Sequence, residues 1–184
     1  MEKKNILIVC GTLRKNGYNL QLANVIKQLI SKQADVSYLD YSELPPMNQD
    51  LESPEPASVA AVRGAVRAAN GIWFVTPQYN ASFPGHIKNL IDWLSRPLPG
   101  QGRGSVVITG RKVTVSGAGG RTATTEMRRE LGSLLAFVGA DVMSEPETGI
   151  ALSGGSWQTG KLKLSDDDRS ALSAQVDAFL EFIA

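Results

Sequence analysis

The sequence predicts an α/β protein built as a doubly wound, five-stranded parallel sheet in the strand order 2-1-3-4-5. Short continuous apolar runs, such as residues 6–10 and 72–76, are typical of strands buried on both faces. The stretches between these runs carry apolar residues at helical spacing, as over residues 19–32. Right-handed crossovers fold such an alternation into a parallel sheet covered by helices on both sides.

Strands and helices are expected to alternate along the chain. Strands are expected over residues 6–10, 36–39, 72–76, 113–116 and 140–143, and helices over residues 19–32, 59–69, 84–94, 127–138 and 165–183. Pro77 should end the third strand because proline cannot donate to a strand ladder. Gly139 suits a helix C-cap, and Ser165 with Asp168 resembles a capping box. A further β-like run at residues 106–109 is compatible with a loop or an edge pairing.

Composition limits the classes of protein to which the chain can belong. The 184 residues suit one domain spanning residues 1–184, and 19 Lys and Arg against 18 Asp and Glu leave a net charge of +1. This balance excludes broad electrostatic attraction to nucleic acid or to an anionic membrane. One Cys and one His exclude an internal disulfide and are too few for a structural zinc site, so no metal is expected. The first apolar run is too short for a secretory signal or a membrane span, which favours a cytoplasmic location.

The predicted topology also says where a ligand should bind. In a doubly wound sheet, ligands lie at the carboxyl ends of the strands, close to the point where the strand order reverses. Here that point lies beside strands one, three and four. The residues that follow these strands are 11–19, 77–83 and 117–121.

The first of these segments, residues 11–19, has the properties of a phosphate-binding loop. It runs from a buried strand into a helix, so it offers free backbone N–H groups, the positive end of the helix dipole and Arg14. Thr12 and Asn19 add side-chain donors, and two glycines allow close backbone approach. The alternative is a glycine-rich turn whose charged side chains are only solvated.

The spacing in this loop argues against other phosphate-binding patterns. A Walker A loop needs Gly, four residues and then Gly-Lys-Ser/Thr, whereas five residues separate Gly11 from Gly17 and Tyr18 follows. The Gly-x-Gly-x-x-Gly dinucleotide fingerprint is absent as well. A small tyrosine phosphatase would need Cys10 as its thiolate and an Arg six positions later, but that position is Asn16. Cys10 is therefore interpreted as a small buried hydrophobe.

The second and third segments suit a flat ligand. Residues 77–85 combine an aromatic side chain and amides beside proline and glycine, which suits a heteroaromatic ring and its polar edge. The alternative is a turn in which Tyr79 simply packs. Residues 116–121 are mostly small and would let a ligand approach the backbone, whereas the alternative is a flexible turn with a solvated Arg121.

Three other features are given structural interpretations. His86, the only histidine, has no Ser-x-Gly elbow or Asp partner in the sequence and is interpreted as a surface or interface residue. The acidic run at residues 166–168 suits a helix N-terminus and lacks the spacing of a cation loop. Trp157 belongs to a polar loop for which the sequence suggests no use.

Together the three segments resemble the NADPH-dependent FMN reductase family, which includes flavodoxin-like quinone, azo-dye and chromate reductases. Residues 11–19, Gly-Thr-Leu-Arg-Lys-Asn-Gly-Tyr-Asn, are similar to the family's Gly-Ser-Leu-Arg-x-x-Ser-x-Asn phosphate loop. Residues 77–93 are similar to its Pro-Glu/Gln-Tyr-Asn…Pro-Gly…Lys-Asn…Asp-Trp signature, which is the most specific match. Residues 116–121 are similar to the segment after its fourth strand. The resemblance spans nearly the whole chain.

The resemblance implies an enzyme with bound FMN that oxidises NADPH or NADH and reduces a small-molecule electron acceptor, such as a quinone, an azo compound or free flavin. It implies that the FMN phosphate lies on Thr12, Arg14, Gly17, Tyr18 and Asn19. It implies that the flavin ring lies against Pro77, Gln78, Tyr79, Asn80, Ser116, Gly117 and Gly119. No catalytic side chain is expected, because the flavin carries the chemistry. A homodimer or homotetramer is expected, with the helix from Pro84 near the interface and exposing Trp93.

The chain departs from the family pattern in the phosphate loop and beside the expected flavin. Thr12 replaces a serine but keeps the hydroxyl, whereas Gly17 replaces a serine that would donate to phosphate. The lost hydrogen bond is worth about 1 kcal/mol. The stretch from Pro97 to Arg111 looks longer than in the family, and the loop after Ser116 looks shorter.

Two other functions are weighed against the reductase. A flavodoxin-like electron carrier or redox-sensing module would use the same flavin, but such carriers are often acidic and this chain has a net charge of +1. A phosphohydrolase would use Cys10, and the position of Arg14 disfavours it.

Overall fold

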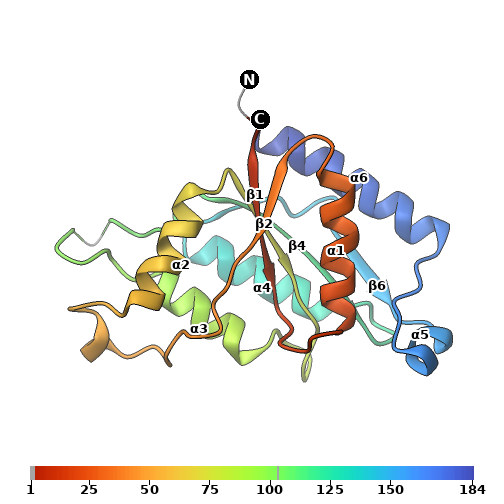
Figure 1. The fold of residues 1–184 in the computed structure, drawn as a ribbon, viewed down its shortest axis with the longest axis horizontal. Helices are drawn as coiled ribbons and strands as arrows, with labels where there is room; N and C mark the ends of the chain where they lie inside the picture. Colours follow the sequence, from red (N-terminus) through yellow and green to blue (C-terminus); the bar gives the residue numbers. More distant parts are fainter. Residues whose placement is uncertain (1–2, 103) are drawn as a thin grey trace.

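The structure, a computed structural model, describes residues 3–102 and 104–184. Figure 1 shows strands and helices alternating along the chain. The strands are β1 (Asn5–Cys10), β2 (Asp35–Tyr38), β3 (Gly71–Val75), β4 (Lys112–Gly119), β5 (Asp141–Val142) and β6 (Thr148–Ala151). The helices are α1 (Tyr18–Ile30), α2 (Ala57–Ala68), α3 (Gly85–Leu94), α4 (Thr125–Phe137), α5 (Gly154–Thr159) and α6 (Asp166–Phe182), with a short 3-10 helix at Gln49–Leu51.

The sheet is parallel and has the predicted order β2-β1-β3-β4-β5. Its fifth position is shared by two strands, which the sequence did not predict. Lys112 at the start of β4 pairs with Asp141 in β5, and Ser116 further along β4 pairs with Thr148 in β6. Pro146 lies between β5 and β6 and cannot donate to a ladder, which explains the interruption.

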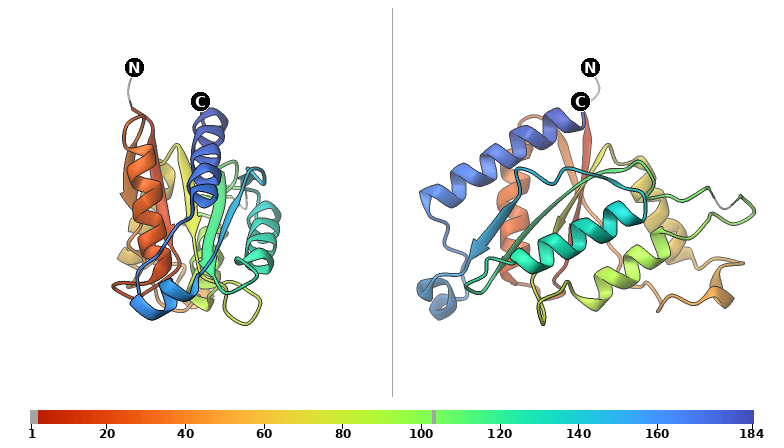
Figure 2. Two further views of the ribbon diagram at one scale, coloured as in Figure 1. Left: turned by 90° about the vertical axis from the view of Figure 1, so that its right-hand side faces the viewer. Right: turned by 180° about the vertical axis from the view of Figure 1, so that it is seen from behind.

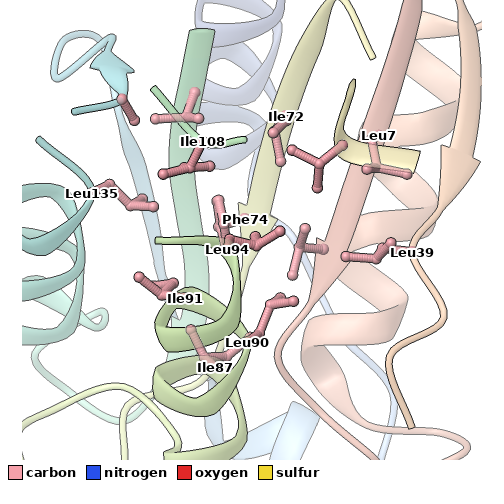
Figure 3. Close-up of a cluster of buried hydrophobic side chains, with 14 of the residues drawn as sticks. Leu7, Leu39, Ile72, Phe74, Ile87, Leu90, Ile91, Leu94, Ile108 and Leu135 are labelled. Carbon is pink, nitrogen blue, oxygen red and sulfur yellow. The ribbon is translucent and has the colours of Figure 1, made fainter. Parts of the chain in front are cut away.

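Helices cover both faces of the sheet and bury a separate hydrophobic cluster on each. The right-hand view of Figure 2 shows α3 and α4 in front of the strands and α1 behind them. On the first face, side chains of α3 such as Ile87, Leu90 and Leu94 pack against Leu7 and Phe74 of the strands (Figure 3). On the other face, α1 and α6 pack against alternate residues of the same strands. Each central strand is therefore buried on both sides, as its continuous apolar run predicts.

Two helix ends have the predicted chemistry. The side chain of Ser165 accepts from the backbone N–H of Asp168, and Asp168 accepts from the backbone N–H of Ser165, which is a complete capping box. Gly139 follows the end of α4 with φ +94, a conformation that glycine adopts without strain.

Three local predictions need correction. Residues 117–119 are expected in a loop, but they belong to β4, because Gly117 and Gly119 pair with residues of β6. Residues 106–109 form turns, with one isolated bridge between Pro97 and Val106, so the loop interpretation is the correct one. Residues 154–159, expected as a loop, form α5.

Trp93 was expected on an exposed helix face, but it is fully buried. Its Nε1 donates to the carbonyl of Pro45 at 2.8 Å, and Asn89 on the same helix also donates to that carbonyl at 2.9 Å. Asn89 further accepts from the backbone N–H of Met47 at 2.7 Å. The Asn and Trp of the 77–93 signature therefore attach α3 to the proline-rich loop that follows β2.

A buried chain of hydrogen bonds crosses the sheet beneath the carboxyl edge. Trp73 in β3 donates from Nε1 to Ser116 Oγ at 3.0 Å, and Ser116 donates to Gln175 Oε1 in α6 at 2.9 Å. Gln175 in turn donates to Thr114 Oγ1 at 2.9 Å and to the carbonyl of Val115 at 3.1 Å. Ser116 is fully buried in this chain, so its hydroxyl is used inside the core.

We predict that Ser116→Ala lowers the free energy of unfolding by about 2–4 kcal/mol, because Trp73 Nε1 and Gln175 Oε1 both lose a buried partner. Urea denaturation measures this change. Ser133→Ala is the control, because Ser133 Oγ makes an exposed bond to the carbonyl of Arg129. Unchanged stability together with weaker flavin binding would show that Ser116 contacts the ligand and does not support the core.

Candidate functional site

A cavity of about 190 Å³ lies at the carboxyl edge of the sheet, where the topology predicts a ligand. It is lined by Thr12, Arg14, Gly17, Tyr18, Asn19, Pro77, Gln78, Tyr79, Ala118, Gly119, Gly120, Leu152 and Trp157. Three predicted site residues, Asn80, Ser116 and Gly117, are outside this lining. Ala118 and Gly120 belong to the predicted segment 116–121, whereas sequence reasoning missed Leu152 and Trp157.

The loop between β1 and α1 presents a positive helix end to the cavity. Gly17 is the N-cap of α1, and no side chain caps the helix. The first turn carries no acidic residue, so the helix dipole is not compensated there. Arg14 is exposed at the same loop. Backbone N–H groups, the dipole and a guanidinium thus converge on one place, which suits an anion.

Gly11 and Gly17 are both required by close packing. A Cβ at Gly11 would lie 2.0 Å from Thr76 Oγ1, so only glycine at position 11 lets the chain after β1 run this close to Thr76. A Cβ at Gly17 would lie 2.7 Å from Thr12 Oγ1 and 3.0 Å from Thr12 Cγ2. The side chain of Thr12, with its hydroxyl and its methyl group, therefore fills the space that a side chain at position 17 would need.

The side chain of Asn19 joins two of the predicted segments. Its Nδ2 donates to the carbonyl of Ala118 at 2.9 Å, and its Oδ1 accepts from the N–H of Ala118 at 2.8 Å. Asn19 is buried, so these bonds are shielded from water. The amide holds the start of α1 against the end of β4 and sets the distance between the phosphate loop and residues 118–120.

The segment after β3 is a tight turn that projects from the cavity. Tyr79 and Ser82 exchange backbone bonds of 2.8 and 3.0 Å, and Asn80 and Ala81 between them have φ values of 51 and 64. Two consecutive positive φ values are typical of a type I′ turn, in which asparagine is favoured. Gln78 donates to Thr122 Oγ1, just before α4, and accepts from the N–H of Met127 in the first turn of α4.

The small residues at the end of β4 are explained by packing. A Cβ at Gly117 would lie 2.4 Å from the carbonyl of Thr76 and 2.6 Å from Thr124 Oγ1. A Cβ at Gly119 would lie 2.8 Å from Thr124 Cγ2. Thr124 is fully buried, so these glycines allow residues 120–124 to fold back over the strand. Gly119 still lines the cavity, whereas Gly117 does not.

Helix α5 forms the remaining wall. Tyr18 donates from its hydroxyl to the carbonyl of Ser156 at 2.8 Å, and its ring meets that of Trp157 edge-on with centroids 5.6 Å apart. Gln21 of α1 donates to the carbonyl of Gly160 at 2.9 Å. An N-cap serine in the pattern Ser153-x-x-Ser156 is the signal that could have revealed this helix.

Cys10 lies at the end of β1, beneath the phosphate loop. Burial raises the pKa of the Cys10 thiol, and the backbone hydrogen bond with Thr12 lowers it by less. The thiol is therefore protonated at neutral pH, which is unfavourable for a phosphatase nucleophile.

His86, expected at the surface, is half-buried: its Nε2 lies 3.1 Å from the carbonyl of Gly11, and its ring stacks on Tyr41.

A second cavity of about 480 Å³ lies beside α4, away from the predicted segments. Its polar lining includes an ion pair between Arg128 and Glu147. Burial raises the pKa of Glu147, Arg128 opposes this shift, and Glu145 adds to it.

Within residues 3–102 and 104–184, no group of three His, Cys, Asp or Glu side chains is placed to hold a metal ion. No helix in those two ranges has the length and apolar character to span a bilayer.

Comparison with known proteins agrees with the geometry. A sequence profile of the NADPH-dependent FMN reductase family matches residues 4–154. Over 190 residues, the chain is 33% identical to a quinone reductase of Escherichia coli K12, covering 99% of this chain and 96% of the relative. It is 29% identical over 179 residues to a 2-hydroxy-1,4-benzoquinone reductase of a Burkholderia species, covering 97% and 95% of the two chains. The structure of FerB, an NAD(P)H:(acceptor) oxidoreductase of Paracoccus denitrificans, superposes with a TM-score of 0.85 at 30% identity over 99% of this chain and 97% of FerB.

The chain therefore belongs to the NADPH-dependent FMN reductase family. It has the flavodoxin-like fold and is a flavin-dependent oxidoreductase that uses NAD(P)H. The predicted fold, family, enzyme class and cofactors are confirmed.

We predict that Gly17→Ser alone weakens FMN binding, because its Cβ collides with Thr12 Oγ1 and Cγ2. Adding Thr12→Ser should restore binding, because a serine side chain has no methyl group and can rotate its hydroxyl away from position 17. We expect a loss of about three- to tenfold in affinity for the single variant. Flavin fluorescence titration measures the dissociation constants of both. If the single variant binds FMN more tightly than the wild type, the packing explanation is wrong and the added hydroxyl is a phosphate donor.

Asn19→Leu should leave the N–H and carbonyl of Ala118 buried without partners. We expect the free energy of unfolding to fall by about 2–4 kcal/mol, and FMN affinity to fall with it because the two segments separate. Chemical denaturation and flavin titration measure the two effects. Asn24→Leu is the control, since its exposed side chain only accepts from the hydroxyl of Tyr38. Full stability in Asn19→Leu would contradict the proposed role of the amide.

Proposed function

We propose that the protein reduces quinones with electrons from NAD(P)H, using FMN held in the 190 Å³ cavity. The observation that carries the proposal is the uncapped, positive N-terminus of α1 with Arg14 at one end of this cavity. The other end is walled by residues 77–79 and 118–120, which suit a flat ring. Quinone reductases of Escherichia coli and Pseudomonas putida are relatives at 33% and 30% identity, which supports this class of acceptor.

The residues that would hold FMN divide into two groups. The phosphate would be bound by the backbone of residues 12–18, by Arg14 and by the hydroxyl of Thr12. The ring would lie against Pro77, Tyr79 and the backbone of residues 118–120. Asn19 and Gln78 would act by positioning, because their described hydrogen bonds go to other parts of the chain. Asn80, Ser116 and Gly117 are left out of the proposed contacts, because they do not line the cavity.

The chemistry needs little from the side chains. FMN held in this cavity would supply the hydride-transfer chemistry that connects NAD(P)H to the acceptor. Backbone N–H groups at the carboxyl edge can donate to negative charge on the reduced ring. Tyr79 lines the cavity and is half exposed, so its ring is available to stack on an aromatic acceptor.

An electron carrier is the second candidate. It would require the flavin edge to face a protein partner, and the segments around the cavity carry basic residues that could meet an acidic one. The similarity to NAD(P)H-dependent relatives over nearly the whole chain favours the enzyme.

We also propose a single domain over residues 1–184, a cytoplasmic location and a homodimer or homotetramer. The sheet connects elements from both halves of the chain, which supports one domain. The supply of NAD(P)H and the unpaired Cys10 support the cytoplasm. The resemblance to oligomeric reductases supports the assembly. Trp93 does not contribute to a subunit interface on α3, because it is buried within the chain.

The first test is the visible spectrum of the purified protein with FMN, before and after anaerobic addition of NADPH. Bleaching of a protein-bound flavin, followed by recovery on adding a benzoquinone, is the expected result. Bleaching without recovery by any quinone would contradict the acceptor, and bound flavin that NADPH and NADH leave oxidised would favour the carrier. Absence of bound flavin would contradict the site.

Arg14→Ala should raise the dissociation constant for FMN about 10- to 100-fold, because a charged hydrogen bond to phosphate is lost. Affinity for riboflavin, which lacks the phosphate, should stay the same. The matched control is Arg67→Ala, which removes an exposed arginine from the last turn of α2. An equal loss for FMN and riboflavin would mean that Arg14 contacts the ring or supports the loop.

A further inference from the structure

We propose that residues 152–163, with Trp157 at the centre, form a subsite for the adenosine phosphate end of NAD(P)H beside the flavin cavity. The inference rests on the proposed function, because it places the co-substrate of that reaction. Neither the family motifs nor the phosphate loop includes this segment. The proposed subsite is argued from the exposed ring of Trp157, the hydrogen bonds that hold the segment beneath this ring, and the charged side chains around it.

Trp157 exposes a large aromatic surface at the cavity. It is 59% exposed, whereas Trp73 and Trp93 are fully buried. Tyr18 meets it edge-on and therefore covers only part of the indole ring. Trp157 and Leu152 line the same cavity as Arg14 and Tyr79. An exposed indole at the rim of a polar cavity is well placed to stack on a planar ligand.

The support under Trp157 is more extensive than a surface turn requires. The carbonyl of Ser156 accepts from Tyr18, and Ser156 Oγ accepts from the N–H of Lys163 at 3.1 Å. Gln21 donates to the carbonyl of Gly160 and accepts from the N–H of Leu162 at 2.8 Å. Helix α5 is thus attached to α1 on both sides of the tryptophan. An indole held in this way loses little conformational entropy when a ligand binds.

The charges around the cavity exceed what one phosphate needs. The segments 11–19, 77–83, 118–124 and 152–164, all within the described structure, carry Arg14, Lys15, Arg121, Lys161 and Lys163 and no Asp or Glu. The whole chain has a net charge of only +1, so these four segments are more basic than the rest of the chain. Arg14 and the start of α1 are assigned to the FMN phosphate, which leaves exposed Lys161 and Lys163 on the α5 side for a second anion.

NAD(P)H supplies the chemistry that matches both features. Its adenine is a flat base that can stack on indole, and its diphosphate can pair with lysines. A quinone has a flat ring but no phosphate, so it would leave the lysines unused. NADPH carries a further phosphate on the adenosine ribose, so this subsite is also where NADPH and NADH would be distinguished.

The test uses the FMN-loaded protein and two probes, 5′-ADP and adenosine 2′,5′-bisphosphate, with tryptophan fluorescence as the binding signal. Since Trp73 and Trp93 are buried, the response should come from Trp157 and disappear in Trp157→Phe. We expect saturable quenching by both probes, stronger for the bisphosphate if NADPH is preferred. Equal quenching supports the subsite without a preference between the two co-substrates.

Kinetics on the same proteins separates binding of the co-substrate from binding of the flavin. Trp157→Ala should raise the KM for NADPH about tenfold, with smaller effects on kcat and on the FMN dissociation constant, because Trp157 lines only one side of the flavin cavity. Trp157→Phe should keep a KM near that of the wild type. Lys163→Gln should raise KM about threefold, and high salt should reduce this difference.

Phe137→Ala and Lys32→Gln are the matched controls, because both side chains are exposed near the opposite edge of the sheet. Neither should change KM. The proposal is overturned if the probes give no saturable signal and Trp157→Ala leaves KM unchanged. It is also overturned if Trp157→Ala weakens FMN binding as much as it raises KM, because Trp157 would then hold the flavin. A wild type that binds no FMN would contradict the proposed function first and this subsite with it.

Discussion

The two hydrogen bonds between Asn19 and the backbone of Ala118 connect the halves of the site. A parallel sheet brings the ends of β1, β3 and β4 to one edge, but it does not by itself set the loops at a fixed distance. The buried amide does so at 2.8 and 2.9 Å, with Asn19 on the first turn of α1 and Ala118 near the end of β4. Because α5 is attached to α1 through Tyr18 and Gln21, the third wall depends on the same contact. The cavity is therefore formed by rigid elements before any ligand binds.

Glycine makes this arrangement possible on the neighbouring strands. Gly11 and Gly117 approach Thr76 from the two strands beside β3, and a Cβ on either would collide with it. The strand ends can thus lie at their normal spacing while Thr76 stays buried between them. From the sequence, Gly117 is interpreted as a residue that lets a ligand approach the backbone. The structure shows that the absence of a side chain at Gly117 instead leaves room for Thr76 and Thr124. Small residues near a site can serve either purpose, and only the neighbouring atoms distinguish them.

The sequence was sufficient for the strand order and for the region of the site. Continuous apolar runs such as residues 72–76 and helical spacing such as residues 19–32 depend on local pattern and predict well. The orientation of a polar side chain depends on distant partners. Ser116 was assigned to the flavin, but Gln175, which is 59 residues away along the chain, takes its hydroxyl into the core. Trp157 had no periodic pattern around it, so its place in the cavity wall was visible only once α5 lay beside Tyr18.

FMN is proposed to bind in the cavity between α1, the end of β4 and α5. Hydrogen–deuterium exchange with and without FMN tests this most directly, because it reports on each segment without a mutation. We expect slower exchange over residues 12–19, 77–79 and 118–120 when FMN is bound. Residues 128–147, around the larger cavity, should be unchanged. Protection confined to residues 128–147, with none at the carboxyl edge, would contradict FMN binding in this cavity.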